Sequence, residues 1–182
     1  MESDAINIDG MVRLYRGDVL NDWSDSSGTG GALLLDGSGQ TFVTESPYAA
    51  AGGTDRLVFS FDTTRGCART TESTGLPSGA QPRTMMGWFN QESFINHAVP
   101  FGYGRMTTAH AFNLYITPAS EISFDWAGGG DGSFLTFYTA DDGFSLNAWF
   151  HVAITYDGTH MRAYVNGEIQ REVNDMTPNT QL

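Results

Sequence analysis

The sequence predicts an all-β fold, a two-sheet antiparallel sandwich, from two observations. Apolar and polar residues alternate at period two in several segments, and no stretch longer than about ten residues keeps apolar positions at helical spacing. In addition, Asp157-Gly158 and Asn166-Gly167 each stand between alternating segments. Such dipeptides form tight hairpin turns because they tolerate positive φ angles. Together these patterns indicate strands joined by short turns.

The carboxyl-terminal third predicts three consecutive antiparallel strands, over 149–156, 159–165 and 168–173, with the two Gly-containing dipeptides as their turns. In the first of these strands two sets of side chains alternate, and one set must face a core. The first set is Phe150, Val152, Ile154 and Tyr156, and the second is Trp149, His151, Ala153 and Thr155.

Further strands follow from the same alternation, and they are expected over 56–62, 112–117, 121–126 and 133–139. Weaker signals predict short strands at 12–15, 32–35 and 41–44. Thr63 to Gln81 is rich in Thr, Ser and Gly and is predicted to be a long polar surface loop. Turn-like residues occupy 117–120 and 127–132.

Composition and charge limit how many domains the chain can form and which partners it can bind. With 182 residues, 40% of them hydrophobic, we expect one domain covering 1–182. The net charge of −12 at pH 7 argues against nucleic acid as a partner. No run approaches the roughly 18 apolar residues of a membrane span, so no membrane insertion is expected. A single cysteine, Cys67, excludes an intrachain disulfide.

The nine basic residues are all arginine, and acidic residues number 21. An acidic surface of this kind suits an extracellular or virion-associated protein, because it stays soluble where salt screens charge. The amino end, Met1 to Asp4, has neither the basic nor the apolar region of a signal peptide.

Three segments together resemble the laminin G-like jelly rolls of the concanavalin A-like lectin/glucanase superfamily. They are Leu76 to Asn90, Phe112 to Trp126 and Trp149 to Gln170. The resemblance covers about residues 10–175 and implies a concanavalin A-like jelly roll. Members usually continue beyond the Tyr-Val-Asn-Gly hairpin with a closing strand, whereas this chain ends at Leu182. We therefore expect a sandwich that lacks this strand, and either a homo-oligomer or a partner chain that donates it.

The superfamily also contains glycoside hydrolases, whose laminarinase-like members carry Glu-x-Asp-x-Glu on one strand. The nearest match here is Glu121-Ile122-Ser123-Phe124-Asp125, which has Ser in place of the middle carboxylate and a shorter final acid. This substitution disturbs the paired-carboxylate geometry that hydrolysis requires, so we predict no catalytic residues. Glu121 and Asp125 are instead expected to lie on a solvated strand face.

Sugar and metal binding have stronger candidates. Asp131, Asp141, Asp142 and Asn147 lie in predicted loops and could converge at one end of the sandwich. Trp126 is either a platform for sugar stacking or part of the core. Laminin G-like relatives often bind calcium at such a rim, so the resemblance implies a calcium site at Asp131, Asp141 and Asp142, with scattered solvated acids as the alternative. For His151, the resemblance implies a side chain that supports the sheet.

These observations predict a non-catalytic recognition or adhesion module that binds a glycan or a protein surface at the sandwich rim, with calcium assistance. A structural subunit of a virion or surface assembly is the first alternative, because the same fold can serve packing. A degenerate glycoside hydrolase is the second.

Overall fold

A computed structural model describes most of the carboxyl-terminal part of the chain and several strands before it. The described residues are 34–36, 40–45, 56–61, 67–70, 72–93, 98–104, 110–126 and 134–182. Contacts divide the chain into two compact units, Met1–Leu76 and Pro77–Leu182, and each is described by itself. The single-domain prediction stays a prediction.

The first unit contains two antiparallel strand pairs. Strand β1 (Leu34–Asp36) pairs with β4 (Cys67–Arg69), and β2 (Gln40–Glu45) pairs with β3 (Arg56–Phe61). The prediction of one loop from 63 to 81 is wrong in part, because β4 lies inside it. Backbone pairing with β1 decides the conformation there, and local composition does not. The strand predicted at 12–15 falls outside the described residues.

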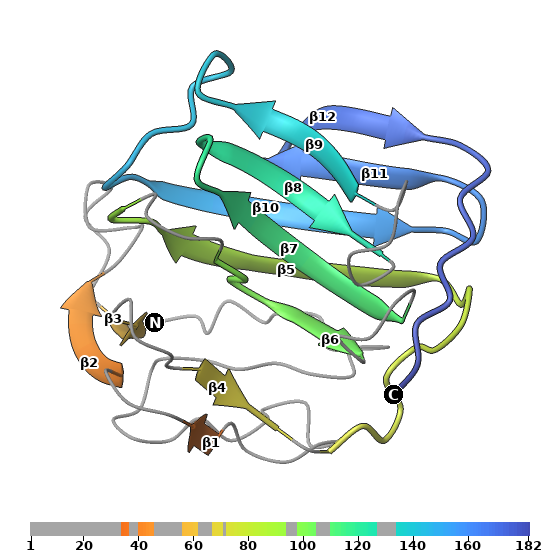
Figure 1. Ribbon diagram of the computed structural model, residues 1–182, viewed down its shortest axis with the longest axis horizontal. Helices are drawn as coiled ribbons and strands as arrows, with labels where there is room; N and C mark the ends of the chain where they lie inside the picture. Colours follow the sequence, from red (N-terminus) through yellow and green to blue (C-terminus); the bar gives the residue numbers. More distant parts are fainter. Residues whose placement is uncertain are drawn as a thin grey trace, which may run out of the picture. The chain divides into compact units, whose positions relative to one another are not determined.

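The second unit contains two four-stranded antiparallel sheets, with strand orders β12-β11-β10-β5 and β6-β7-β8-β9. In Figure 1 the second of these sheets lies over the first. The strands are β5 (Arg83–Asn90), β6 (Gly102–Gly104), β7 (Ala111–Thr117), β8 (Glu121–Asp125), β9 (Phe134–Thr139), β10 (Trp149–Tyr156), β11 (Met161–Val165) and β12 (Glu168–Val173). Among the described residues no helix is long and apolar enough to cross a membrane.

The hydrophobic core lies between the two sheets of the second unit. Strand β10 alternates strictly between half-buried and buried residues, as a strand with one core face should. The predicted set Phe150, Val152, Ile154 and Tyr156 is the buried one, so the opposite set faces outward. The other sheet contributes the inward side chains of β7 and β8, namely Phe112, Leu114, Ile116, Ile122 and Phe124. The core confirms the all-β sandwich.

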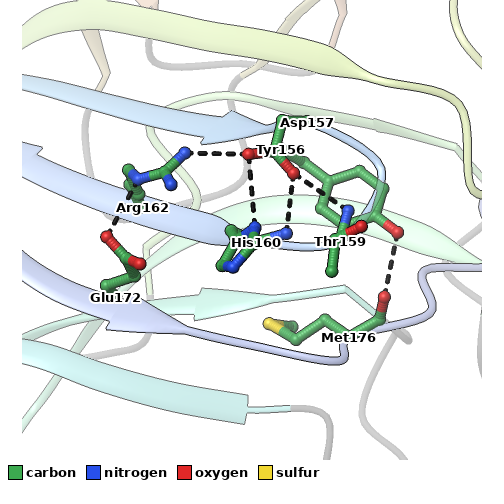
Figure 2. Close-up of polar contacts among 7 residues, drawn as sticks. All are labelled: Tyr156, Asp157, Thr159, His160, Arg162, Glu172 and Met176. Atoms are coloured by element: carbon green, nitrogen blue, oxygen red, sulfur yellow. Dashed lines mark hydrogen bonds and ion pairs between the residues drawn. The ribbon is translucent and has the colours of Figure 1, made fainter.

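The two predicted hairpins form, but one turn is longer than expected. Asn166 and Gly167 have φ angles of 51° and 87°, so both adopt the positive values of a tight two-residue turn. At the other turn Asp157 accepts hydrogen bonds through Oδ1 from the backbone N–H groups of Thr159 and His160, at 2.9 and 2.7 Å (Figure 2). Strand β11 therefore begins at Met161 rather than at 159.

Strand β5 was not predicted, because its two faces are both partly apolar. Met85 and Phe89 pack on the core side, while Met86 and Trp88 point outward and are exposed. A strand with apolar residues on both faces shows no alternation, so period two is lost from its sequence. Its pairing with β10 runs from Arg83–Tyr156 to Asn90–Trp149.

Residues 174–182 run back along the second unit without forming a strand. Their pairing is limited to an isolated antiparallel bridge between Gly79 and Thr180, and the N–H of Gln181 donates to the carbonyl of His110 at 3.1 Å. Further up the segment, the Tyr156 hydroxyl donates to the carbonyl of Met176 at 2.9 Å. Side-chain hydrogen bonds and a single bridge thus hold this segment against the second unit.

Candidate functional site

The predicted acids Asp141 and Asp142 lie in the segment between β9 and β10. Asp142 accepts two hydrogen bonds through Oδ2, from the N–H and the hydroxyl of Thr139, both at 2.9 Å. Phe144 follows in this segment and is buried against Phe150, with ring centroids 5.1 Å apart. The aromatic contact and the backbone turn hold this rim segment in a defined shape.

Asp141 is exposed and lines a shallow depression of about 300 Å³ at the same rim, together with Glu121, Thr139 and two alanines, Ala119 and Ala140. The hydroxyl of Thr117 donates to Oε2 of Glu121 at 3.2 Å. The depression therefore offers two carboxylates and a hydroxyl to a ligand with hydroxyl groups. None of the described residues that line it is aromatic.

The other predicted residues lie elsewhere. Trp126 follows the end of β8 that pairs with Phe134, whereas Glu121 at the opposite end of β8 pairs with Thr139. Trp126 is therefore separated from Asp141 by the length of the β8–β9 pair, about 14 Å. Its indole stacks on Phe124 at 5.9 Å and packs against the core, which favours the core interpretation.

Asn147 has a φ of 57° and donates its backbone N–H to the carbonyl of Gln91 at 2.9 Å, next to the start of β10. Asp131 lies outside the described residues. Whether it converges with Asp141 and Asp142 therefore stays a prediction.

The described acidic residues supply few of the oxygen ligands that calcium needs. Calcium takes six to eight oxygen ligands, several of them carboxylates. Within the described ranges, the structure groups fewer than three His, Cys, Asp or Glu side chains at any point where a metal could bind. Asp142 already accepts two hydrogen bonds from Thr139. The described part of the predicted site does not fit calcium by itself, and the site stays a prediction.

The strand that resembles a hydrolase motif has its three polar residues on one face. Ile122 and Phe124 point into the core, so Glu121, Ser123 and Asp125 share the opposite face. The expectation of a solvated face is wrong for Asp125, which is only 1% exposed. The Ser123 and Thr136 hydroxyls are 2.9 Å apart and hydrogen-bonded.

Tyr115 on β7 lies on this face as well, opposite Ser123 in the strand register. Burial, followed by the charge of Asp125, raises the pKa of the Tyr115 phenol. The phenol is thus neutral at neutral pH, and the face forms a covered polar layer on β7 and β8.

A second surface, which the sequence patterns did not single out, is the outward face of β5 and β10. Trp88 is 40% exposed and Met86 is 55% exposed. His151 is opposite Trp88 in the register, and their rings meet edge to face with centroids 5.2 Å apart. Burial lowers the pKa of His151. The prediction that His151 supports the sheet agrees with this packing.

Comparisons with known proteins agree with the fold. A family model described as the concanavalin A-like lectin/glucanases superfamily matches residues 62–181. Among solved structures, the chain is similar to domain 4 of AbnA, a GH43 extracellular arabinanase from Geobacillus stearothermophilus, in complex with arabinotriose. The identity is 17%, the TM-score is 0.61, and the match covers 88% of this chain and 74% of that one.

Comparison with curated protein sequences finds no significant match. The structural likeness, at low identity, shows the fold alone. The family match covers well over half of the chain and includes both hairpins and the two four-stranded sheets of the second unit. The chain therefore belongs to the concanavalin A-like lectin/glucanases superfamily.

Proposed function

We propose that the protein is a non-catalytic module that recognises a glycan. The superfamily name covers both lectins and glucanases, so the question is which of the two activities the residues of this chain favour. The observation that carries the proposal is the state of the β8 face, where a hydrolase of the resembled type would hold its carboxylates.

Glycoside hydrolysis needs two carboxyl groups that reach one sugar from a shared cleft, about 5 to 9.5 Å apart. In this chain the middle position of the motif is Ser123, whose hydroxyl is hydrogen-bonded to the Thr136 hydroxyl. Asp125 is buried, so its carboxyl group lacks the access to substrate that a nucleophile or acid needs. Glu121 alone borders a depression. These features support recognition over hydrolysis.

The arabinanase domain that shares this fold was solved in complex with arabinotriose. Because that domain holds a sugar, a saccharide is the first ligand class to test for this chain. The depression with Glu121 and Asp141 adds oxygen acceptors that suit sugar hydroxyls.

An array of neutral and anionic oligosaccharides that includes arabinotriose tests the proposal. We expect binding to at least one saccharide and no release of reducing sugar from any bound ligand. Absence of binding on the whole array would contradict recognition. Release of reducing sugar that Glu121→Gln abolishes would instead establish hydrolysis.

Calcium assistance, with Asp131, Asp141 and Asp142 as ligands, is a separate proposal that the same array tests. If calcium organises the rim, a chelator lowers binding and added calcium restores it. Asp141→Asn should then reduce the response to calcium, whereas equal binding in chelator and in calcium would overturn this part. Asp142 is less suitable for substitution, because it also holds the turn at Thr139.

A further inference from the structure

We propose that a neutral glycan lies on the outward face of β5, β10, β11 and β12 and stacks on the indole of Trp88. This inference rests on the proposed function and adds a location and a ligand class to it. The place differs from the predicted rim, since the inference uses none of Trp126, Asp141, Asp142 or Asn147.

Trp88 offers exposed aromatic surface on a rigid support. Trp88 belongs to a strand paired along its whole length with β10, so its Cα position is fixed by a continuous ladder. Its ring contacts His151 edge to face, which limits its rotation. An indole that is 40% exposed and already held in place loses little conformational entropy when a sugar ring stacks on it.

Exposed apolar side chains continue from Trp88 across the sheet as a band. In the strand register Met86 is opposite Ala153, Ala153 is opposite Tyr164, and Tyr164 is opposite Ile169. Met86 and Ile169 are both more than half exposed. Four strands at ~4.8 Å spacing give this row a length of about 14 Å, which accommodates a short run of sugar rings next to Trp88.

The distribution of charged side chains indicates that the ligand of this face is neutral. The whole chain carries −12, yet the row from Met86 to Ile169 and the neighbouring Trp88–His151 pair contain no ionised side chain at neutral pH. The next row along the strands carries Arg162, whose charge is offset by bonds of 2.9 Å to both Asp157 and Glu172. A neutral saccharide avoids the repulsion that an anionic polymer, or a second copy of this acidic chain, would meet.

An unsatisfied polar atom lies next to the platform. Asn90 follows Trp88 on the same face of β5, and its Oδ1 is buried with no hydrogen-bond partner among the described residues. Buried polar atoms are normally met by protein, water or ligand. Rotation of the Asn90 carboxamide toward the surface would let a sugar hydroxyl supply the donor that this oxygen lacks, so stacking and hydrogen bonding would come from neighbouring positions on one face of β5.

The test is the affinity of the saccharide that binds best on the array, measured by calorimetry for the wild-type chain and five variants, one of which is Asp141→Asn. Trp88→Ala should raise the Kd by about tenfold or more, and Trp88→Phe should raise it less because a ring remains. Asn90→Leu should weaken binding without lowering stability, since it removes an unsatisfied buried oxygen. Val99→Ala, which also shortens an exposed apolar side chain, is the matched control and should bind normally.

The outcomes separate this inference from the function on which it rests. No binding by the wild-type chain to any saccharide removes the proposed function itself. Binding that survives Trp88→Ala but is lost in Asp141→Asn keeps the function and overturns the location. Preference for anionic saccharides overturns the ligand class. A wild-type dimer that Trp88→Ala converts to monomer, with saccharide binding unchanged, would show that a second copy occupies this face. Thermal unfolding of each variant confirms that the fold is kept.

Discussion

Arg83 is only 7% exposed, and within the described part of the chain neutral oxygens hold its guanidinium. Its shortest bonds run to the carbonyls of Gly79 and Gln81, at 2.6 and 2.8 Å, and to the Thr180 hydroxyl at 2.8 Å. The guanidinium carbon of Arg83, Cζ, also lies 5.1 Å from the centre of the Phe112 ring. One side chain thus connects β5 to the segment before it and to the carboxyl-terminal segment.

Arg83→Leu should lower the free energy of unfolding by about 3 kcal/mol, because several buried oxygens lose their donor at once. Arg83→Lys keeps the charge but not the planar fork, so a smaller loss is expected. Urea denaturation measures both. A loss below about 0.5 kcal/mol for Arg83→Leu would contradict the role assigned to this residue.

Asp157 organises the β10–β11 turn through polar contacts drawn in Figure 2. Its carboxylate accepts from the backbone N–H groups of His160 and Thr159 and from Arg162, and these bonds lower its pKa well below the ordinary value of 3.8. A carboxyl group with a lower pKa in the folded state stabilises the fold above its unfolded pKa. That contribution is lost as the pH falls toward the folded pKa.

Asp157→Asn should therefore lower the Tm at pH 7, and the difference from the wild-type chain should shrink as the pH falls below about 4. Asp141→Asn, which changes an exposed carboxylate in another turn, is the control and should change the Tm little. Thermal unfolding followed by circular dichroism from pH 3 to 7 measures both variants. A constant difference across this range would show that the Asp157 charge is not responsible.

At the scale of elements, the contact between β6 and β7 depends on a glycine. Gly102 pairs with Asn113, and a Cβ at Gly102 would lie 2.1 Å from Oδ1 of Asn113. Asn113 is buried, so its side chain has little room to move away.

Gly102→Ala should destabilise the protein by roughly 1–3 kcal/mol, as overpacking does. In an Asn113→Ala background the same change should cost less, because the clashing carboxamide is gone. A double-mutant cycle measures this coupling from denaturation curves. Strictly additive effects would mean that the two residues do not collide.

Elements with local signals were predictable from the sequence. The hairpins around Gly158 and Gly167 combine turn residues with alternating strands, and β10 has the predicted bounds. Strand β5 was not predicted because Trp88 and Met86 are apolar and exposed, which removes the alternation from its sequence. The proposed glycan site rests on the same exposed side chains.

For the predicted rim site, closeness in sequence was a poor guide to distance. Trp126 and Asp141 follow opposite ends of the β8–β9 pair, so the length of that pair separates them. The order of the predicted strands already implied this separation. The burial of Asp125 was not predictable in the same way, because alternation places a residue on a face without saying what covers that face.

In the second unit as a whole, the carboxyl-terminal segment 174–182 buries several of its side chains although it forms no strand. Met176, Pro178 and Thr180 are all buried, and the segment is bonded to Tyr156 and Gly79. Deleting residues 174–182 should lower the Tm substantially, because it exposes part of the core and removes a partner of Arg83. Deleting Leu182 alone, whose side chain is exposed, should have little effect. Equal Tm values for the two deletions would contradict this account.

The central proposal is that the acidic sandwich binds a neutral glycan at one part of its outward surface, where the Trp88–His151 pair and the row from Met86 to Ile169 carry no ionised side chain. The most direct measurement is calorimetric titration of the wild-type chain and of Trp88→Ala with the best neutral saccharide of the array, under identical conditions. The account predicts saturable binding by the wild-type chain and a Kd about tenfold higher or more for the variant, with an unchanged Tm. Equal Kd values for the two proteins would contradict it.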